Sequence, residues 1–129
     1  MEKYSHKVHY YECDAMGITH HSNYIRIMEE ARIEYLDRIG YNFARMESEG
    51  IVSPVVSLSC RYLKPTRFDE VIETEVKIVS VTPLKLTLSY EMTVGGSVVF
   101  SAESVHCFIE DGRPVKIAER FPRLFDNLV

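Results

Sequence analysis

The sequence lacks any Cys-x-x-Cys pair. Its three cysteines, Cys13, Cys60 and Cys107, are widely spaced along 129 residues. A structural zinc site or a thioredoxin-like redox motif therefore has little support. Isolated cysteines of this kind are typical of small, partly buried side chains that stay reduced, and we expect a cytoplasmic protein.

Long hydrophobic runs are also missing. The apolar stretches are interrupted every few residues, whereas a transmembrane helix needs ~20 apolar residues in a row, so we expect no membrane span. An excess of positive charge is missing as well, because fifteen Lys and Arg stand against nineteen Asp and Glu, for a net charge of −4. Without basic runs the chain is poorly suited to neutralise phosphates, and we expect no nucleic-acid partner.

The composition that is present is that of an ordinary globular protein. Hydrophobic residues make up 46% and charged residues 26%, close to the average for such proteins. The chain is long enough for one domain and too short for two ordinary ones. We expect a single domain spanning residues 1–129.

One long helix is predicted over residues 23–39, where apolar side chains recur at intervals of three and four residues. Ser22 or Asn23 is expected to cap its start, and Gly40 lies where a C′ glycine would end it. A shorter helical segment is expected near residues 42–49. The charged residues of the long helix are expected to form a solvated face made of Glu29, Glu30, Arg32, Glu34, Asp37 and Arg38.

The rest of the chain predicts antiparallel strands. Residues 84–94 alternate between apolar and polar side chains, and Gly95-Gly96 allows a tight hairpin into a partner strand at 97–109. An α+β fold follows, in which a curved antiparallel sheet of five to six strands wraps around one long central helix. Such a sheet leaves its edge strands open, and we expect at least a homodimer. The other expected strands are residues 4–12, 55–63 and 70–80.

The polar segment 11–24 joins the first strand to the long helix and carries the candidate site. A helix N-terminus presents free N–H groups and about half a positive charge, which suits a developing oxyanion. Asp14 precedes this terminus, and the turn at Gly17 would let its carboxylate face the helix. A carboxylate beside backbone N–H groups can attack an acyl carbonyl or activate water against it.

A thioester suits so sparse a site. Its thiol leaving group has a pKa of roughly 8.5 and departs without a strong general acid. An amide would need such an acid, and the sequence has no Ser–His–Asp pattern or Gly-x-Ser-x-Gly elbow. The residues therefore favour thioester hydrolysis over proteolysis.

Two motifs resemble those of a known family. Residues 14–24, Asp-Ala-Met-Gly-Ile-Thr-His-His-Ser-Asn-Tyr, resemble the signature Asp-x-x-Gly-aliphatic-x-x-His-x-x-Tyr of the 4-hydroxybenzoyl-CoA thioesterase family, whose members are hotdog-fold acyl-CoA thioesterases. Residues 62–67 resemble its Tyr-x-x-Pro-Ala-Arg connection, with Thr66 in place of Ala. The resemblance implies hydrolysis of an acyl-CoA to a carboxylic acid and free CoA, without a metal or organic cofactor.

The resemblance also implies roles for individual residues. Asp14 matches the catalytic carboxylate, acting as nucleophile or general base, and Gly17 matches the glycine that lets the chain turn close to the thioester. The backbone N–H of His21 matches the donor that polarises the carbonyl, and its side chain matches a residue that lines the site. Tyr24 matches an aromatic residue that packs there against the substrate.

By the same analogy, the pantetheine arm of CoA runs between subunits and the nucleotide lies near surface cations. The candidates for this role are Lys64, Arg67 and Lys85, the last on the polar face of its predicted strand. The analogy also implies a homotetramer built from two dimers.

Two other functions remain open at this point. One is a thioesterase or hydratase acting on acyl-carrier-protein substrates, and the other is a non-catalytic hotdog module that binds acyl-CoA. A Cys13–His21 scheme competes with Asp14, although adjacent residues of an extended segment point to opposite sides. A metal cluster could be drawn from Cys13 and several histidines, but the spacings match no common ligand pattern and no metal site is expected. Those histidines are His6, His9, His20 and His21.

Overall fold

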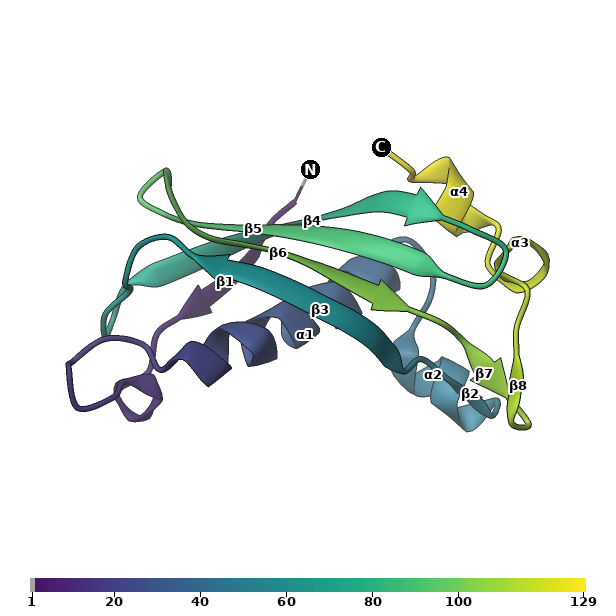
Figure 1. Ribbon diagram of the computed structural model, residues 1–129, viewed down its shortest axis with the longest axis horizontal. Helices are drawn as coiled ribbons and strands as arrows, with labels where there is room; N and C mark the ends of the chain where they lie inside the picture. Colours follow the sequence, from purple (N-terminus) through teal and green to yellow (C-terminus); the bar gives the residue numbers. More distant parts are fainter. Residues whose placement is uncertain (1) are drawn as a thin grey trace.

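The computed structural model describes residues 2–129 and contains a five-stranded antiparallel sheet that arches over one long helix (Figure 1). The strand order is β1-β4-β5-β6-β3, so β1 and β3 are the two edges of the sheet. A small second sheet has the order β2-β7-β8. Within residues 2–129, no helix is long and apolar enough to cross a membrane.

The elements follow one another in the order expected from the sequence, with one long helix placed before most of the strands. The strands are β1 (Tyr4–Lys7), β2 (Ile51–Val52), β3 (Val55–Tyr62), β4 (Val71–Val81), β5 (Leu86–Val94), β6 (Ser97–His106), β7 (Ile109–Glu110) and β8 (Arg113–Pro114). The helices are η1 (Tyr10–Glu12, a 3-10 turn), α1 (His21–Arg38), α2 (Phe43–Ser48), α3 (Ile117–Arg120) and α4 (Arg123–Asp126).

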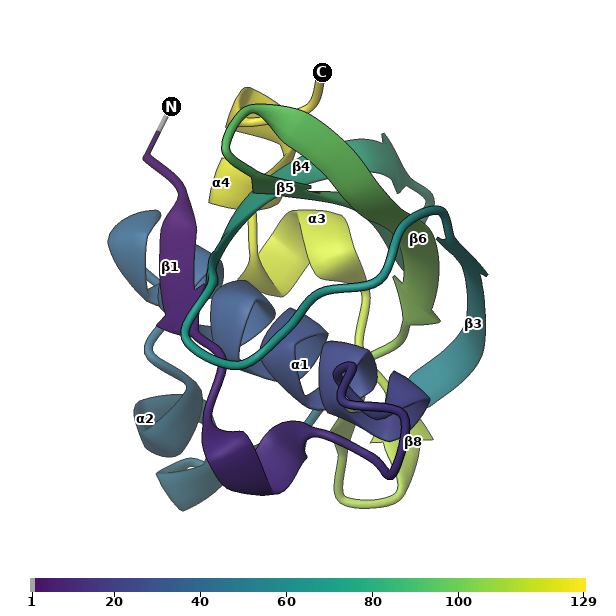
Figure 2. The same ribbon diagram turned by 90° about the vertical axis from the view of Figure 1, so that its left-hand side faces the viewer.

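The core lies between α1 and the concave face of the sheet. Seen end-on, the sheet curves around the helix, with β1 and β3 on opposite sides of it (Figure 2). Three register shifts, at Val55/Ser57, Ile78/Ser80 and Met92/Thr93, are the β-bulges that bend the strands. Full burial of one large aliphatic side chain is worth roughly 1.5–3 kcal/mol, so the apolar faces of α1 and β5 hold the two layers together. The buried apolar residues of these two elements are Tyr24, Ile27, Met28, Ala31, Tyr35 and Leu36 on α1, and Leu86, Leu88, Tyr90 and Met92 on β5.

Helix α1 ends as predicted but begins differently. Gly40 has a φ of +102° and follows the C-cap Ile39. The N–H of Tyr41 donates to the carbonyl of Leu36 and that of Gly40 to the carbonyl of Asp37, which is the Schellman arrangement. The predicted N-cap, Ser22 or Asn23, is wrong, because His20 holds this position and its Nδ1 accepts from the N–H of Ser22.

The strand predictions hold for the centre of the sheet and fail in part at the N-terminus. The hairpin at Gly95-Gly96 joins β5 to β6 as expected. The first predicted strand, residues 4–12, is only Tyr4–Lys7, because the chain then turns into η1. The strand predicted at 84–94 begins at Leu86, since the N–H of Lys85 donates to Thr82 Oγ1 in a turn.

The predicted solvated face of α1 is wrong at one residue. Arg32 is buried and lies against β5 and β6, where its Nη1 is 3.5 Å from Nε2 of His106. Ser104 Oγ is 2.6 Å from the same Nε2 and 2.7 Å from the hydroxyl of Tyr90. Burial, together with the nearby Arg32 cation, lowers the pKa of His106 to about 4. A polar cluster therefore sits inside the apolar layer between helix and sheet.

This cluster predicts a loss of stability in mild acid. Between about pH 6.5 and pH 4 the unfolded chain protonates His106 while the folded chain does not, so the free energy of unfolding falls as the pH is lowered. The full effect is about 3 kcal/mol, from the difference between the two pKa values. Urea denaturation followed by circular dichroism across this range measures it. H106Q should show a smaller pH dependence than the wild type, and equal slopes would contradict the assignment.

Candidate active site

A short closed loop carries Asp14. An isolated bridge pairs Cys13 with Thr19, and the N–H of Asp14 donates to the carbonyl of Ile18 at 2.8 Å. The N–H of Gly17 donates back to the carbonyl of Asp14 at 3.0 Å, and Gly17 has a φ of +77°, a conformation that favours glycine. The predicted turn at Gly17 is therefore confirmed, and it holds Asp14 at the base of the loop.

The Asp14 side chain is half-buried and oriented by its own loop. Its Oδ1 accepts a hydrogen bond from the N–H of Met16 at 2.8 Å. Among residues 2–129 no ion pair and no hydrogen bond to Oδ2 is found. One carboxylate oxygen is thus fixed in place while the other is free to meet a substrate or a water molecule.

The first turn of α1 includes a backbone donor that is free within residues 2–129, the N–H of His21. The carbonyl of Glu12 accepts from both the N–H of His20 and Nδ2 of Asn23, each at 2.8 Å. The N–H groups of Ser22 and Asn23 donate to Nδ1 and the carbonyl of His20, respectively. The N–H of His21 has no acceptor in the part of the chain that the structure describes. An 18-residue helix adds its dipole to this donor.

A cavity of ≈ 380 Å³ opens beside this helix start. It brings together four of the residues predicted for the site, since Asp14, His21, Tyr24 and Lys64 all line it. The remaining wall is largely apolar and comprises Met16, Ile18, Thr19, Tyr62, Leu63 and Pro65. A carboxylate, a free N–H and apolar walls around one opening are the parts that an acyl-transfer site needs.

The other predicted residues lie outside the cavity lining. Gly17 shapes the loop without lining the cavity. Arg67 lies in the connection between β3 and β4, where its N–H donates to Oε1 of Glu70. Lys85 lies in the β4–β5 turn, outside the strand on which it was expected. Its neighbour Leu86 pairs with His106 at one end of β6, whereas Tyr62 of the cavity pairs with Phe100 near the other end. Lys85 and the cavity therefore lie toward opposite ends of the sheet. Cys13, the nucleophile of the competing scheme, is absent from the lining.

Tyr62 has a role at the site that the sequence did not reveal. Its hydroxyl donates to the carbonyl of His21 at 3.0 Å, and its ring meets that of Tyr24 edge to face at 5.3 Å. Partial burial, with the neighbouring Cys60 thiol, raises the pKa of Tyr62 to about 12, so the hydroxyl stays protonated. Tyr62 therefore ties the end of β3 to the first turn of α1. Its position in the second family-like motif was the available signal.

A buried relay of hydroxyl groups underlies the cavity. Thr66 Oγ1 lies 2.6 Å from Thr19 Oγ1 and 2.9 Å from the hydroxyl of Tyr24, and the side chain of Thr66 is completely buried. The backbone of Thr66 is also used, because its carbonyl accepts from the N–H of Thr19 at 2.8 Å. Thr66 thus connects the loop, the helix and the β3–β4 connection. An Ala at this position would keep the bonds from Thr19 to the carbonyl but would lose the link to Tyr24 on α1.

Comparison with known proteins identifies the family. The sequence pattern of the thioesterase-like superfamily matches residues 8–124. The chain belongs to this superfamily. YneP of Bacillus subtilis, provisionally named an acyl-CoA thioesterase, is 30% identical over 119 residues, covering 90% of this chain and 86% of YneP. YbgC of Escherichia coli, named an acyl-CoA thioester hydrolase, is 24% identical over 114 residues, covering 88% of this chain and 84% of YbgC.

Solved structures agree with the family. A hypothetical protein from Aquifex aeolicus superposes with a TM-score of 0.91 and 33% identity, covering 95% of this chain and 97% of that one. A DHNA-CoA thioesterase from Staphylococcus aureus gives a TM-score of 0.89 and 26% identity, covering 98% and 87%. The predicted α+β hotdog fold and the predicted thioesterase family are both confirmed.

The hydroxyl relay predicts a specific stability effect. T66V keeps the shape of the side chain but removes the hydroxyl that pairs with Thr19 and Tyr24. Thr19 Oγ1 keeps its hydrogen bond to the carbonyl of residue 66 at 3.1 Å, so the buried hydroxyl of Tyr24 is the group left unpaired. We expect the free energy of unfolding to fall by about 1–3 kcal/mol, the cost of unpaired buried polar groups. Urea denaturation measures this, and T66S, which keeps the hydroxyl, should lose much less. Equal stability of the two variants would show that the relay contributes nothing.

Proposed function

We propose that the protein hydrolyses acyl-CoA thioesters to a carboxylic acid and free CoA, with Asp14 as the catalytic carboxylate. One observation carries the proposal. Asp14 and the helix-start residue His21, whose N–H has no acceptor within residues 2–129, line the same cavity. The names of the acyl-CoA thioester hydrolase YbgC and of the DHNA-CoA thioesterase support the substrate class.

The reaction needs only water and groups of this chain. In the general-base route, the Asp14 carboxylate takes a proton from water, and the resulting hydroxide attacks the thioester carbonyl carbon. The carbonyl oxygen becomes an oxyanion and accepts a hydrogen bond from the N–H of His21. The intermediate then breaks its C–S bond, and the departing thiolate takes up the proton held by Asp14.

In the nucleophilic route, Asp14 itself attacks the carbonyl carbon and expels the thiolate, which is then protonated. The resulting anhydride is hydrolysed by water, which restores the carboxylate. Both routes place the developing negative charge at the helix start, where the dipole of α1 stabilises it. The overall balance is the same, because one water is consumed and the acid and thiol are released.

The basic residues near the cavity suit the nucleotide of CoA. Lys64 lines the cavity while its Nζ donates to Ser97 Oγ at 3.0 Å, which holds the ammonium group at the surface. Arg67 follows it in the same connection between β3 and β4. Phosphate groups at the mouth of the cavity would meet these two cations, whereas Lys85 of the same chain lies at the other end of the sheet.

The cysteines fit a reducing compartment. Cys13, Cys60 and Cys107 are free and half-buried. A cytoplasmic location accordingly forms part of the proposal.

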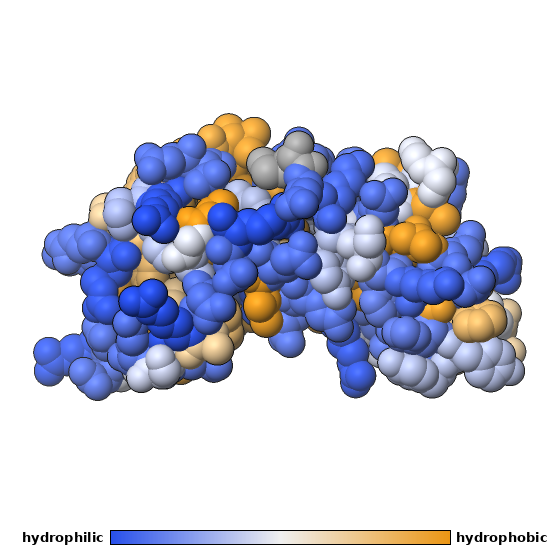
Figure 3. Space-filling model, turned by 180° about the vertical axis from the view of Figure 1, so that it is seen from behind, coloured by the Kyte–Doolittle hydropathy of each residue, from blue (hydrophilic) through white to orange (hydrophobic). Residues whose placement is uncertain are grey.

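The proposal also includes pairing of two copies through β3. This edge strand is exposed over nearly its whole length and carries exposed apolar side chains, with Val55 at 50%, Val56 at 48% and Leu58 at 40%. An apolar strand with free backbone groups is a template for pairing with a second chain. The molecule viewed from the side of β1 is mainly hydrophilic, with hydrophobic residues in small separate groups (Figure 3). This asymmetry supports a homodimer through β3, and the resemblance to the family supports a tetramer made of two such dimers.

The catalytic assignment predicts a large loss of activity in D14N. The amide can still accept from the N–H of Met16, so the loop should keep its shape, but it can neither attack nor deprotonate water. We expect hydrolysis to fall by at least ~10²-fold. Thiol release from a panel of acyl-CoA substrates measures this rate, and acyl-carrier-protein substrates run beside it distinguish the two carriers.

The matched control is D126N, which changes an exposed aspartate on α4. This variant should retain the wild-type rate. Full activity in D14N would remove Asp14 from the mechanism, and binding of acyl-CoA without turnover by the wild type would favour a non-catalytic binding module instead.

The pairing of β3 predicts an effect on assembly. L58K places a charge on the edge strand and should yield single chains, whereas the wild type should have two or four times that mass in light scattering or sedimentation. V79K, which adds a charge to an exposed residue of the interior strand β4, is the control and should assemble normally. A wild type that sediments as a single chain would overturn the proposed pairing.

A further inference from the structure

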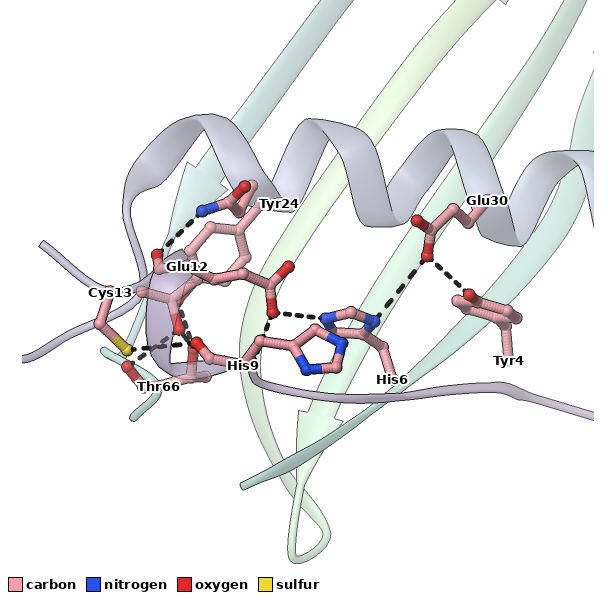
Figure 4. A network of polar contacts seen from close by, with 10 residues as sticks. Tyr4, His6, His9, Glu12, Cys13, Tyr24, Glu30 and Thr66 are labelled. Atoms are coloured by element: carbon pink, nitrogen blue, oxygen red, sulfur yellow. Dashed lines mark hydrogen bonds and ion pairs between the residues drawn. The ribbon is translucent and has the colours of Figure 1, made fainter. Parts of the chain in front are cut away.

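Two histidines and a glutamate come together where β1 meets η1. His6 lies on β1, His9 precedes η1 and Glu12 ends it. One ligand atom from each residue, a ring nitrogen or a carboxylate oxygen, lies within 4.8 Å of the other two. The three side chains converge on one small region beside α1 (Figure 4). The histidine spacings alone predicted no metal site, and Glu12 was not among the candidate ligands, because the strand was expected to continue through residue 12, whereas the 3-10 turn folds Glu12 back toward His6.

We propose that His6, His9 and Glu12 form a binding site for a divalent transition-metal ion such as Zn²⁺. Two imidazole nitrogens and one carboxylate oxygen are a common donor set for Zn²⁺ and Co²⁺, whereas Mg²⁺ and Ca²⁺ prefer oxygen donors alone. Three protein ligands leave a fourth position for water. Binding at Zn–N and Zn–O distances of about 2.0–2.2 Å requires only a small closing movement of these side chains.

The groups around the cluster are those expected of an outer shell. A metal-binding histidine usually donates its second ring N–H to a carboxylate, which fixes the tautomer and the ring orientation. Nδ1 of His6 lies 3.8 Å from Oε1 of Glu30, within ion-pair distance but longer than a hydrogen bond, while Nε2 faces Glu12. Glu30 in turn accepts from the hydroxyl of Tyr4 at 2.6 Å. The His9 ring stacks on Tyr11, with ring centres 5.1 Å apart and planes 8° apart.

Glu12 is already prepared as a ligand. Its Oε1 accepts from the N–H of His9 at 2.7 Å and faces Nε2 of His6 at 2.8 Å. These two contacts hold the Glu12 carboxylate in one orientation, facing the ring of His6. Metal binding replaces one His6–Glu12 hydrogen bond with two bonds to the ion and keeps the backbone bond from His9.

The site would brace the chain just ahead of the catalytic loop. None of its three ligands lines the cavity that holds Asp14. The carbonyl of Glu12, however, accepts from the N–H of His20 and from Nδ2 of Asn23 at the start of α1. An ion held by the Glu12 side chain would therefore fasten β1, η1 and the first turn of α1 together, which is a structural role and not a step of the reaction.

Direct metal titration tests the proposal. Full-length protein without a histidine tag is stripped with a chelator and titrated with Co²⁺, followed by visible absorption, and with Zn²⁺, followed by calorimetry. We expect one ion per chain and a rise in the melting temperature on addition of Zn²⁺. Affinity should fall at low pH, because the histidines bind as neutral imidazoles.

Three variants separate metal binding from folding. H6Q can still donate to Glu12 and H9Q keeps the backbone bond to Glu12, so both should fold, as circular dichroism verifies, yet bind Zn²⁺ at least ~10²-fold more weakly. E30Q removes only the outer carboxylate and should weaken binding by about 10-fold, at the low end of the range for such partners.

The control is H20Q, because His20 and His21 form a second histidine pair with ring centres 4.1 Å apart. This variant should bind one Zn²⁺ with unchanged affinity. Unchanged binding in folded H6Q and H9Q, loss of binding in H20Q, or no ion bound by the wild type would each overturn the proposal. None of these results bears on hydrolysis by Asp14, which is measured separately.

Discussion

The burial of α1 against the concave face of the sheet is the constraint on which the rest of the structure depends. Its apolar residues, from Tyr24 to Leu36, are covered by the strands, and the backbone groups within the helix satisfy one another. Only the ends of such a helix retain backbone groups without helical partners. The C-terminal end is closed by the turn at Gly40. Chemistry that uses the backbone is thereby limited to the N-terminal end.

At that end most polar groups have partners, and the N–H of His21 is a backbone donor without one within residues 2–129. The carbonyl of Glu12 takes two hydrogen bonds, and Tyr62 donates to the carbonyl of His21. Thr66 joins the hydroxyls of Thr19 and Tyr24. A rigid surround of this kind fixes the direction of the His21 N–H before any substrate arrives. Such preorganisation is what makes a backbone donor effective at an oxyanion.

The sequence predicted what depends on neighbouring residues and missed what depends on distant ones. The alternation in β5, the glycine hairpin and Gly40 are local signals, and the structure agrees with them. Asp14 and His21, which line one cavity, could be placed together from the sequence because one short motif contains both. Arg32 was misjudged because its charge is typical of an exposed residue, although its spacing from Tyr24 and Met28 places it on the buried face of α1. The polar partner that makes this burial possible, His106 on β6, lies far along the chain and leaves no local signal.

Contacts between residues that a local pattern does not show also explain why the strand predicted at 4–12 was too long. Aromatic residues, His and Val made 4–12 resemble a strand, but β1 pairs with β4 only as far as Lys7. The following turn becomes favourable because Glu12 can cap it, with its carboxylate accepting from the N–H of His9 and facing His6. Glu12 therefore does two things at once, since its side chain orders the His6–His9 region while its carbonyl holds the start of α1. A ligand that restrains the Glu12 side chain would also restrain the start of α1, because the carboxylate and the carbonyl that holds the helix belong to the same residue.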